Sequence, residues 1–348
     1  MKAAFLFGRE DLRLQETPVP PIQETEILLR VQAASLCGTD LRMYKSGHKF
    51  ATPESPLIIG HEMSGVITAV GRKVAHFQEG SRVMVGPNLG CGYCELCISG
   101  HTHLCPRYQA LGIHLHGAFA EYVRIPEAAI RQGNIFEISA SLSWTEASLI
   151  EPLSCVYNAF ERAQIRPGDA VLIFGAGPIG LMHAKMAKMA GASQVLISDP
   201  NQARLEECTH VDPSFISLSG PEIKTQILER TRGRGVEVAM VACPAPVAQQ
   251  LALEMAATNG RIIFFGGLPA DKSIVPLDTN LIHYKQILVT GTTKASLQHI
   301  RKTLDLLESG LLRVDDLIRD RYAIDQIEEA MAKLAEGRGL KHTIVFEA

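Results

Sequence analysis

A glycine-rich turn between an apolar strand and a helix restricts the fold of this chain more than any other feature. Val171–Phe174 is a continuous apolar strand, and Gly175–Gly180 reads Gly-Ala-Gly-Pro-Ile-Gly directly after it. Residues 178–190 are typical of a helix, and a second strand over residues 195–198 is followed by Asp199. This order is typical of a dinucleotide-binding unit, although a bare G-x-G-x-x-G turn also occurs in methyltransferases and in α/β sheets that bind no nucleotide.

The residues of this turn suit the phosphates of a dinucleotide. Gly175 permits the tight turn, Gly177 lets the backbone approach the pyrophosphate, and Gly180 permits close contact between helix and strand. The N-terminus of the helix faces the phosphates. Asp199 would accept hydrogen bonds from the adenosine ribose and repel a 2′-phosphate, which favours NAD over NADP. Arg204 could instead pair with a 2′-phosphate, so NADP stays open.

Further strands and a helix follow the glycine-rich turn. Strands are expected over residues 236–241, 261–265 and 287–290, with a helix over residues 247–256. Apolar strands that alternate with helices predict a doubly wound parallel sheet covered on both faces. An exposed strand over residues 287–290 at a sheet edge could pair across a dimer, so we expect a homodimer or a homotetramer.

The first 150 or so residues have a different composition and pattern. They are rich in Gly, Pro and short β-branched runs, and strands are expected over residues 27–31, 65–70 and 82–85. Turn signals such as Gly80-Ser81 separate these runs. This pattern predicts an irregular antiparallel β-barrel.

The tail of the chain is mixed. From about Leu297 it reads as an amphipathic helix, a loop, a helix over residues 324–335 and a strand over residues 343–346, which we expect to return to the first domain. The expected fold class is thus α/β plus β. The expected domains are residues 1–153 with 294–348, and residues 154–293.

Length and charge limit the function classes. A chain of 348 residues is long enough for two domains, and its 46% hydrophobic and 20% charged residues are typical of a globular protein. A net charge of −3 indicates neither a nucleic-acid partner nor an acidic membrane surface. The start of the sequence does not resemble a signal peptide and no apolar run could span a membrane, so we expect a cytoplasmic protein.

Four cysteines with short spacing predict a metal site. Cys91, Cys94, Cys97 and Cys105 form the pattern C-x2-C-x2-C-x7-C, and four thiolates at this spacing can surround Zn²⁺ as a tetrahedron. No position is left open on such an ion, so the site would be structural. An iron–sulfur cluster is the alternative metal centre, and two disulfides are the alternative without a metal.

Three isolated residues are weaker candidates for a second metal. Cys37, His61 and Glu151 each have an ordinary explanation: a buried small side chain, a structural histidine and the start of a helix before Pro152. Together, a thiolate, an imidazole and a carboxylate could bind a second zinc with one position open for a substrate oxygen. Their spacing does not show that they meet.

Taken together, these motifs resemble the zinc-containing medium-chain dehydrogenases. Gly60-His61-Glu62-x2-Gly65-x5-Gly71 is similar to the zinc signature of that family, and the cysteine loop, Glu151-Pro152-Leu153 and the glycine-rich turn follow in the family's order. The resemblance covers essentially the whole chain and is closest to the sorbitol dehydrogenase-like branch. It implies a GroES-like β-barrel domain and a Rossmann domain, with the tail returning to the barrel.

The resemblance also implies roles for individual residues. Cys37, His61 and Glu151 fall on the positions of the catalytic zinc ligands, and Glu62 resembles an acid that can exchange with Glu151 or water on the ion. Thr39 matches the hydroxyl that starts a proton relay. The positions that resemble those lining the cofactor are Pro178, Ile179, Asp199, Arg204, Gly266, Gly267 and Thr293, besides the glycines of the turn.

The implied activity is oxidation of a small polar alcohol by NAD, with one catalytic and one structural zinc per chain. The substrate would be a polyol, a sugar acid or a polyol phosphate; threonine and 2,3-butanediol are alternatives within the family. Zinc would lower the pKa of the substrate hydroxyl, and Thr39 would accept its proton. A non-catalytic nucleotide-binding zinc protein, a zinc-independent reductase and a methyltransferase are the alternatives of other classes.

Arg42 departs from the family pattern. The family often has a histidine three residues after the relay hydroxyl, and a guanidinium stays protonated, so it cannot shuttle a proton. The relay would then end in water, His48 or the cofactor ribose. Arg42 and Tyr44 are candidate substrate contacts, because a guanidinium can bind a phosphate or carboxylate; a place in solvent or at the cofactor is the ordinary alternative for Arg42.

Overall fold

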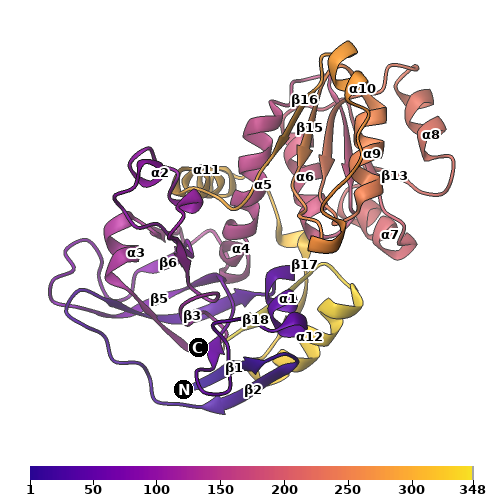
Figure 1. Cartoon of the computed structure of the whole chain (residues 1–348). Helices are drawn as coiled ribbons and strands as arrows, with labels where there is room; N and C mark the ends of the chain where they lie inside the picture. Colours follow the sequence, from indigo (N-terminus) through magenta and orange to yellow (C-terminus); the bar gives the residue numbers. More distant parts are fainter. Residues whose placement is uncertain (347–348) are drawn as a thin grey trace. The chain divides into compact units, whose positions relative to one another are not determined.

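In this computed structural model, residues 1–346 are described. Over these residues the chain folds into two compact units (Figure 1). The first unit comprises Met1–Ser154 together with the stretch that begins at Lys294, and the second comprises Cys155–Thr293.

The first unit is built on a mainly antiparallel sheet with the strand order β10-β6-β5-β3-β18-β17, to which β9 adds by pairing with β3. The strand β18 comes from the C-terminal tail and pairs antiparallel with β3, whereas β17 pairs parallel with β18. Smaller sheets, β2-β1-β4 and β7-β8, complete the unit. Its strands are β1 (Lys2–Gly8), β2 (Asp11–Glu16), β3 (Ile27–Ser35), β4 (Leu57–Ile58), β5 (Glu62–Val70), β6 (Arg82–Val85), β7 (Asn88–Leu89), β8 (Gln109–Ala110), β9 (Tyr122–Ile125), β10 (Ile135–Glu137), β17 (Ile318–Tyr322) and β18 (Lys341–Val345).

Burial of one face explains the long pairing of β3 with β5. Ile27, Leu29 and Val31 alternate along β3 and are fully buried, and they join Met63 in a common core. Gly65 is required in this pairing, because a Cβ atom there would lie 2.2 Å from the carbonyl oxygen of Arg30. The start of β5, which carries Glu62, is thus held in register against the end of β3.

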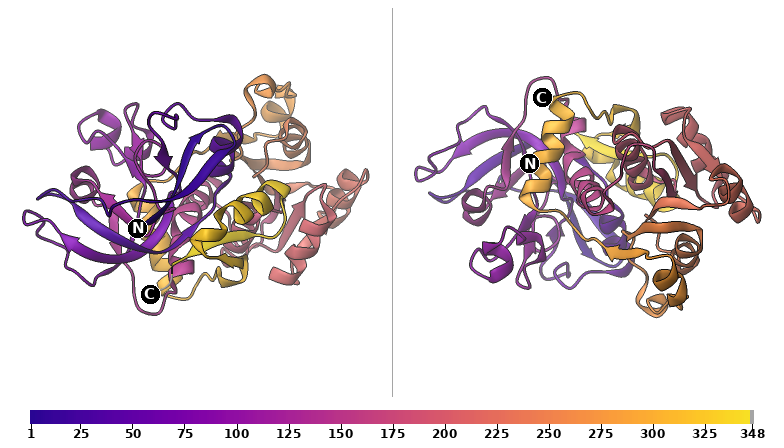
Figure 2. Two further views of the ribbon diagram at one scale, coloured as in Figure 1. Left: turned by 90° about the horizontal axis from the view of Figure 1, so that it is seen from below. Right: turned by 90° about the horizontal axis from the view of Figure 1, so that it is seen from above.

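Helices of the first unit lie around these sheets, and the tail elements are visible in yellow beside the N-terminal strands in Figure 2. They are α1 (Gly38–Ser46), α2 (Glu95–Ile98), α3 (Glu127–Gln132), α4 (Trp144–Ser148), α11 (Leu297–Glu308) and α12 (Ile327–Glu336), with 3-10 helices η1 (Thr102–Leu104), η3 (Asp315–Leu317) and η4 (Ile324–Gln326). The helix α5 (Ile150–Ala163) begins in the first unit and ends in the second.

The second unit is a parallel sheet with the order β13-β12-β11-β14-β15-β16. In chain order this is 3-2-1-4-5-6, the order of a doubly wound dinucleotide-binding sheet. The elements are β11 (Ala170–Phe174), α6 (Pro178–Met189), β12 (Gln194–Ser198), α7 (Gln202–Val211), β13 (Ile216–Leu218), α8 (Ile223–Arg230), β14 (Val236–Val241), α9 (Pro246–Met255), β15 (Ala256–Phe264), η2 (Ala270–Lys272), α10 (Thr279–Tyr284) and β16 (Leu288–Gly291).

Both faces of this sheet are covered. Leu172 packs with residues of α8 and α9 in one core, whereas Ile173 points to the other face and approaches Gly180 of α6. The expected fold class, a doubly wound α/β sheet plus a β-rich domain, is confirmed. The strand β16 lies at the sheet edge, and Leu288 is 56% exposed there; the dimer or tetramer stays a prediction.

Some boundaries differ from the sequence-based expectations. The strand expected over residues 261–265 extends back to Ala256, and the helix expected over residues 324–335 starts with a 3-10 turn. The strand β17 was not expected, because Ile318–Tyr322 carries charged residues between its apolar ones and resembles a loop. Within the described residues, no helix is long and apolar enough to cross a bilayer.

Candidate metal and dinucleotide sites

The four cysteines of the loop converge on one point. Their Sγ atoms all lie within 4.8 Å of one another, with 4.0 Å between Cys91 and Cys97 and 3.8 Å between Cys94 and Cys105. Four sulfurs at about 2.3 Å from a tetrahedral Zn²⁺ would be separated by about 3.8 Å. A disulfide would require about 2.05 Å, and all four thiols are free. The geometry therefore fits a four-coordinate metal.

Backbone and side-chain donors support thiolates in this loop. The N–H groups of Cys91 and Arg107 each donate to the Sγ of Cys105 at 3.4 Å, and the guanidinium of Arg107 donates to Cys91 at 3.6 Å. Backbone donors lower the pKa of Cys91 to about 6, whereas burial raises the pKa of Cys97 to about 12. Gly90 leaves room for the cluster, since a Cβ atom there would lie 2.6 Å from the Sγ of Cys97.

A second group of ligands forms where α1 and β5 begin. Cys37 is the N-cap residue of α1, His61 precedes β5, and Glu62 is its first residue. One ligand atom from each lies within 4.8 Å of the others. His61 and Glu62 are buried, and Cys37 is half-buried. The structure thus brings together a thiolate, an imidazole and a carboxylate from distant parts of the sequence.

Asp40 connects two of these ligands. Its Oδ2 atom accepts a hydrogen bond from the backbone N–H of Cys37 at 2.9 Å, and its Oδ1 atom lies 3.2 Å from the Nδ1 atom of His61. If the proton of the neutral ring is on Nδ1, facing this carboxylate, Nε2 keeps a lone pair for a metal. Burial alone would lower the pKa of His61, but the charges of Asp40 and Cys37 raise it well above its ordinary value. The cluster therefore favours a positive charge at its centre.

Lys341 of β18 holds Glu62 in place. Its Nζ atom donates to the Oε2 atom of Glu62 at 2.5 Å and to the carbonyl of Leu36 at 2.8 Å, and both charged side chains are buried. Burial raises the pKa of Glu62 to about 7, opposed by Lys341 and His61. Burial lowers the pKa of Lys341, but the charge of Glu62 more than offsets it, so that pKa is raised. The Oε1 atom of Glu62 is buried without a hydrogen-bond partner in residues 1–346, as a metal ligand would be before the ion binds.

Glu151 lies close to this group but is not one of its three members. It is buried in the first turn of α5, and its charge raises the pKa of Glu62. The carboxylate that meets Cys37 and His61 is therefore Glu62. Glu151 is a neighbour whose charge acts on Glu62.

The other predicted residues of the first unit, Thr39, Arg42 and Tyr44, all lie on α1 but do not share one site. Thr39 and Arg42 lie three residues apart on α1, and Arg42 is exposed. Tyr44 lines a pocket that Arg42 does not line, together with Glu10, Lys45 and residues of α12. The structure therefore does not group Tyr44 with Arg42.

The glycine-rich turn has the geometry expected of a phosphate-binding loop. Gly175 has φ +110°, and a Cβ atom on Gly180 would lie 1.8 Å from the carbonyl oxygen of Gly175. Beside Gly177, the N-cap residue of α6, a Cβ atom would meet nothing within 4 Å. Pro178 and Ile179 start the helix. Close packing is thus confined to Gly175 and Gly180, and space is left at Gly177 where a ligand would approach.

Asp199 lies after β12 and is buried. Its Oδ2 atom accepts from the backbone N–H of Ala176 and its Oδ1 atom from that of Asn201, both at 2.8 Å. The guanidinium of Arg204 lies 3.8 Å from Asp199. The acid is therefore fixed against the glycine-rich turn, and Arg204 already faces a carboxylate.

The remaining predicted cofactor residues share one pocket of the second unit. Gly266, Gly267 and Thr293 line a cavity of about 510 Å³ with Phe265 and Leu268. A Cβ atom on Gly266 would lie 2.8 Å from the carbonyl oxygen of Cys243, whereas Gly267 faces open space.

Sequence reasoning missed two residues that contact the ligands Cys37, His61 and Glu62. They are Asp40 and Lys341. Asp40 had a local signal, because it follows Cys37 at the third position of a capping box. Lys341 had none, since 279 residues separate it from Glu62.

Comparisons with known proteins agree with this geometry. Residues 23–133 match the family model of the alcohol dehydrogenase GroES-like domain, and residues 178–309 match that of the zinc-binding dehydrogenases. A sorbitol dehydrogenase of Bacillus subtilis (strain 168) is 35% identical, over 96% of this chain and 93% of its own length. An L-threonine 3-dehydrogenase of Bacillus velezensis is 33% identical, over 93% and 92%. The structure of an alcohol dehydrogenase from Escherichia coli CFT073 with bound NADH has a TM-score of 0.89 and 25% identity, over 99% of each chain.

A GroES-like domain with clustered metal ligands and a doubly wound dinucleotide fold define a zinc- and nicotinamide-dependent oxidoreductase. The chain belongs to the zinc-containing medium-chain alcohol dehydrogenase family, in its sorbitol dehydrogenase-like branch.

Proposed function

We propose that this enzyme oxidises a secondary alcohol of a small polyol, sugar acid or polyol phosphate and transfers the hydride to NAD. The observation that carries the proposal is the convergence of Cys37, His61 and Glu62 within 4.8 Å. The similarity to a sorbitol dehydrogenase supports a polyol substrate. Oxidation of L-threonine is the second candidate, because an L-threonine 3-dehydrogenase is 33% identical.

The two ligand clusters would have different tasks. Cys91, Cys94, Cys97 and Cys105 would hold one zinc ion and thereby stabilise a loop. Cys37 and His61, with Glu62 or Glu151, would hold the other and leave one position for the substrate hydroxyl. When bound, zinc supplies Lewis acidity and the dinucleotide supplies the hydride acceptor.

The residues around the second cluster would orient it and remove a proton. Asp40 sets the tautomer of His61, and Lys341 holds one oxygen of Glu62 so that the other stays available. Thr39, half-buried in the first turn of α1, is the proposed acceptor of the hydroxyl proton. A guanidinium such as that of Arg42 cannot shuttle a proton, so water or His48 would complete the path.

Coenzyme choice would depend on Asp199. A buried carboxylate after β12 repels a 2′-phosphate and accepts hydrogen bonds from a ribose, which favours NAD. Arg204, 3.8 Å from Asp199, offsets part of that negative charge. We therefore propose NAD as the coenzyme that the enzyme prefers over NADP.

Replacement of His61 tests the proposed metal site. His61→Ala should lower zinc content from two ions to one per chain and abolish NAD-dependent oxidation of sorbitol and related polyols. The matched control is His76→Ala, an exposed histidine of the same unit that belongs to neither cluster. Near-normal turnover or unchanged zinc content in His61→Ala would show that the assignment is wrong. Oxidation of L-threonine, but of no polyol, would select the second candidate.

A further inference from the structure

A group of basic and aromatic side chains lies beside the metal ligands Cys37, His61 and Glu62 of the first unit. It comes from α1 and the loop after it, from residues on both sides of β8, and from the start of the C-terminal stretch. We call it the cationic cluster, and its members are Arg42, His48, Lys49, Tyr108, His114 and Lys294.

Ring and cation contacts join all members of the cationic cluster except Arg42 into one surface, and the charge of Arg42 acts on His48. The ring of His114 lies 5.2 Å from that of Tyr108 and 6.3 Å from that of His48, and the Nζ atom of Lys294 lies 3.6 Å from the centre of the Tyr108 ring. The Nζ atom of Lys49 lies 4.9 Å from the centre of the Phe50 ring, which in turn contacts His114 at 5.0 Å.

Two positive charges of the cationic cluster have no acidic partner among the described residues. Arg42 and Lys49 form no ion pair within residues 1–346. Burial lowers the pKa of His48, and the charges of Lys49 and Arg42 lower it further. Burial also lowers the pKa of His114, with added effects of His48, Lys49 and Lys294. The positive charges of Arg42, Lys49 and Lys294 therefore act on these histidines and disfavour further positive charge there.

The neutral histidines add hydrogen-bonding capacity. The Nδ1 atom of His114 accepts from the backbone N–H of Ala110 at 3.1 Å, so in the neutral ring the proton is on Nε2, which can donate. The Nδ1 atom of His48 is buried and has no hydrogen-bond partner within the described chain. A buried ring nitrogen without a partner is costly, which points to a polar ligand at this surface.

Two connections place the cationic cluster next to the metal ligands. Arg42 lies one helical turn after Thr39 on α1, the helix that begins at Cys37. The loop that carries His114 packs on the residue before His61: a Cβ atom on Gly112 would lie 2.2 Å from the carbonyl oxygen of Gly60. A substrate held by its hydroxyl at the metal cluster would thus extend toward these charges.

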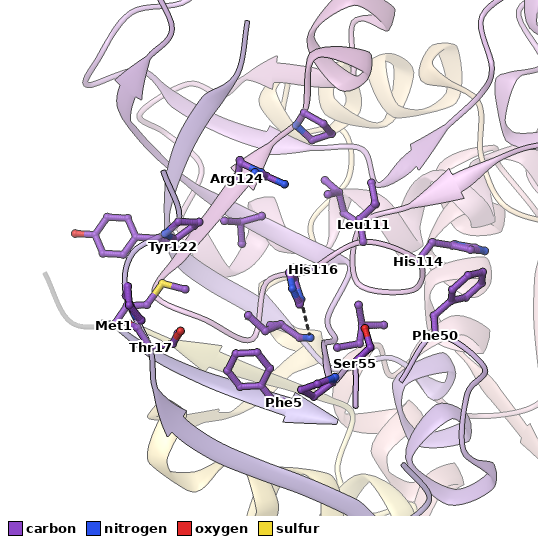
Figure 3. Close-up of a pocket in the computed structure, with 18 of the residues that line it drawn as sticks. Met1, Phe5, Thr17, Phe50, Ser55, Leu111, His114, His116, Tyr122 and Arg124 are labelled. Atoms are coloured by element: carbon purple, nitrogen blue, oxygen red, sulfur yellow. Dashed lines mark hydrogen bonds between the residues drawn. The ribbon is translucent and has the colours of Figure 1, made fainter. Parts of the chain in front are cut away.

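A pocket that adjoins the cationic cluster leaves room for part of a ligand. It has a volume of about 670 Å³, and Figure 3 shows Phe50 and His114 side by side at one end of it, with Met1 and Tyr122 at the other. Lys49 also lines it, and none of the described lining residues is Asp or Glu. A neutral polyol would leave the charges of Arg42 and Lys49 without a partner, whereas an anion would neutralise them.

We propose that the cationic cluster binds an anionic group of the substrate, so that the preferred alcohol is a polyol that ends in a carboxylate or a phosphate. This inference rests on the proposed function and narrows its substrate class. Arg42 and Lys49 would contact the anion as charged donors, and His114 as a neutral one. Charge-assisted hydrogen bonds of this kind commonly change affinity by roughly 10- to 100-fold.

Steady-state kinetics with three matched substrates test the inference. The enzyme with both zinc ions and NAD would be assayed with sorbitol, gluconate and sorbitol 6-phosphate, and the two anionic substrates separate a carboxylate from a phosphate site. We expect kcat/KM at least roughly 10-fold higher for one anion than for sorbitol. Lys49→Gln and Arg42→Gln should each reduce that ratio roughly 10-fold or more. Arg124→Gln is the control, since it removes a positive charge from the lining of the same pocket but not from the cationic cluster, and it should leave the ratio unchanged.

Calorimetric titration provides a second readout that needs no turnover. At least one of gluconate and sorbitol 6-phosphate should bind the zinc- and NADH-loaded enzyme, and Lys49→Gln should weaken that binding. A preference for sorbitol, with the ratio unchanged in both variants, would overturn the inference and leave the proposed function standing. Absence of turnover with all three substrates would contradict the proposed function, and the titration would still decide the inference: equal affinity of wild type and Lys49→Gln for both anions would refute it.

Discussion

The buried ion pair between Lys341 and Glu62 gives the sharpest prediction about the stability of the metal cluster. Lys341→Met keeps a side chain of similar length but removes the charge that faces Glu62 at 2.5 Å and the donor to the carbonyl of Leu36. Both side chains of the pair are at most 5% exposed, so water cannot replace the lost partner. In the zinc-free protein, the variant leaves the carboxylate of Glu62 buried without the charge of Lys341.

The expected loss follows from this burial. Removing one partner of a buried ion pair costs about 3–5 kcal/mol of the free energy of unfolding, whereas an exposed pair contributes about 0–1 kcal/mol. Lys2 and Asp325 provide the exposed control, because their side chains are 41% and 54% exposed at a distance of 2.8 Å. Lys2→Met should therefore leave the free energy of unfolding nearly unchanged.

Urea unfolding followed by tryptophan fluorescence measures both variants. Trp144 is the only tryptophan of the chain and lies in the same unit as Lys341, so its signal reports on that unit. With an m-value of about 2 kcal/mol/M, the midpoint of Lys341→Met should fall by roughly 1.5–2.5 M. The double variant Lys341→Met/Glu62→Gln should regain most of the loss, since it removes the unpaired charge. A loss below about 1 kcal/mol, or no recovery in the double variant, would refute the reasoning.

Three further predictions follow from other contacts. Asp40→Asn should weaken zinc binding at Cys37 and His61 by roughly 10- to 100-fold, measured as zinc retained against a graded chelator; unchanged retention would show that Asp40 does not orient His61. Cys94→Ser should remove the loop zinc and lower the melting temperature; lost turnover with zinc content and melting unchanged would contradict a structural role. His183 is buried with both ring nitrogens unpartnered in the described chain, and burial lowers its pKa to about 3. The unfolded chain binds this proton below about pH 6.5, so stability should fall by about 1.4 kcal/mol per pH unit between roughly pH 6 and 4, and His183→Leu should remove that part of the slope in calorimetric unfolding. Parallel pH slopes in wild type and variant would contradict it.

Local features of the sequence predicted much of the second unit. The order of strand, glycine-rich turn, helix and acid lies within about thirty residues, and each part depends on neighbours in the chain. Burial on both faces makes β11 continuously apolar, which the sequence shows directly. The short strand β17 was missed, because its alternating charged residues become a strand only through pairing with β18.

The metal clusters show where sequence reasoning ends. The four cysteines of the loop are so close in sequence that any compact fold of that loop brings their sulfurs together, as the 3.8 Å and 4.0 Å separations show. Cys37 and His61 are too far apart in sequence for their spacing to bring them together. They meet because β3 and β5 pair with Ser35 opposite Glu62, which brings Cys37, two residues after β3, close to His61, the residue before β5.

The sequence by itself determined the fold class, the loop that can hold a metal and the glycine-rich turn, since all three depend on short-range spacing and periodicity. Only the tertiary structure decided which carboxylate meets Cys37 and His61, and that Lys341 of the last strand pairs with it. The physical reason is that a buried charge needs a partner at contact distance, and such a partner can come from any point along the chain that the fold brings near.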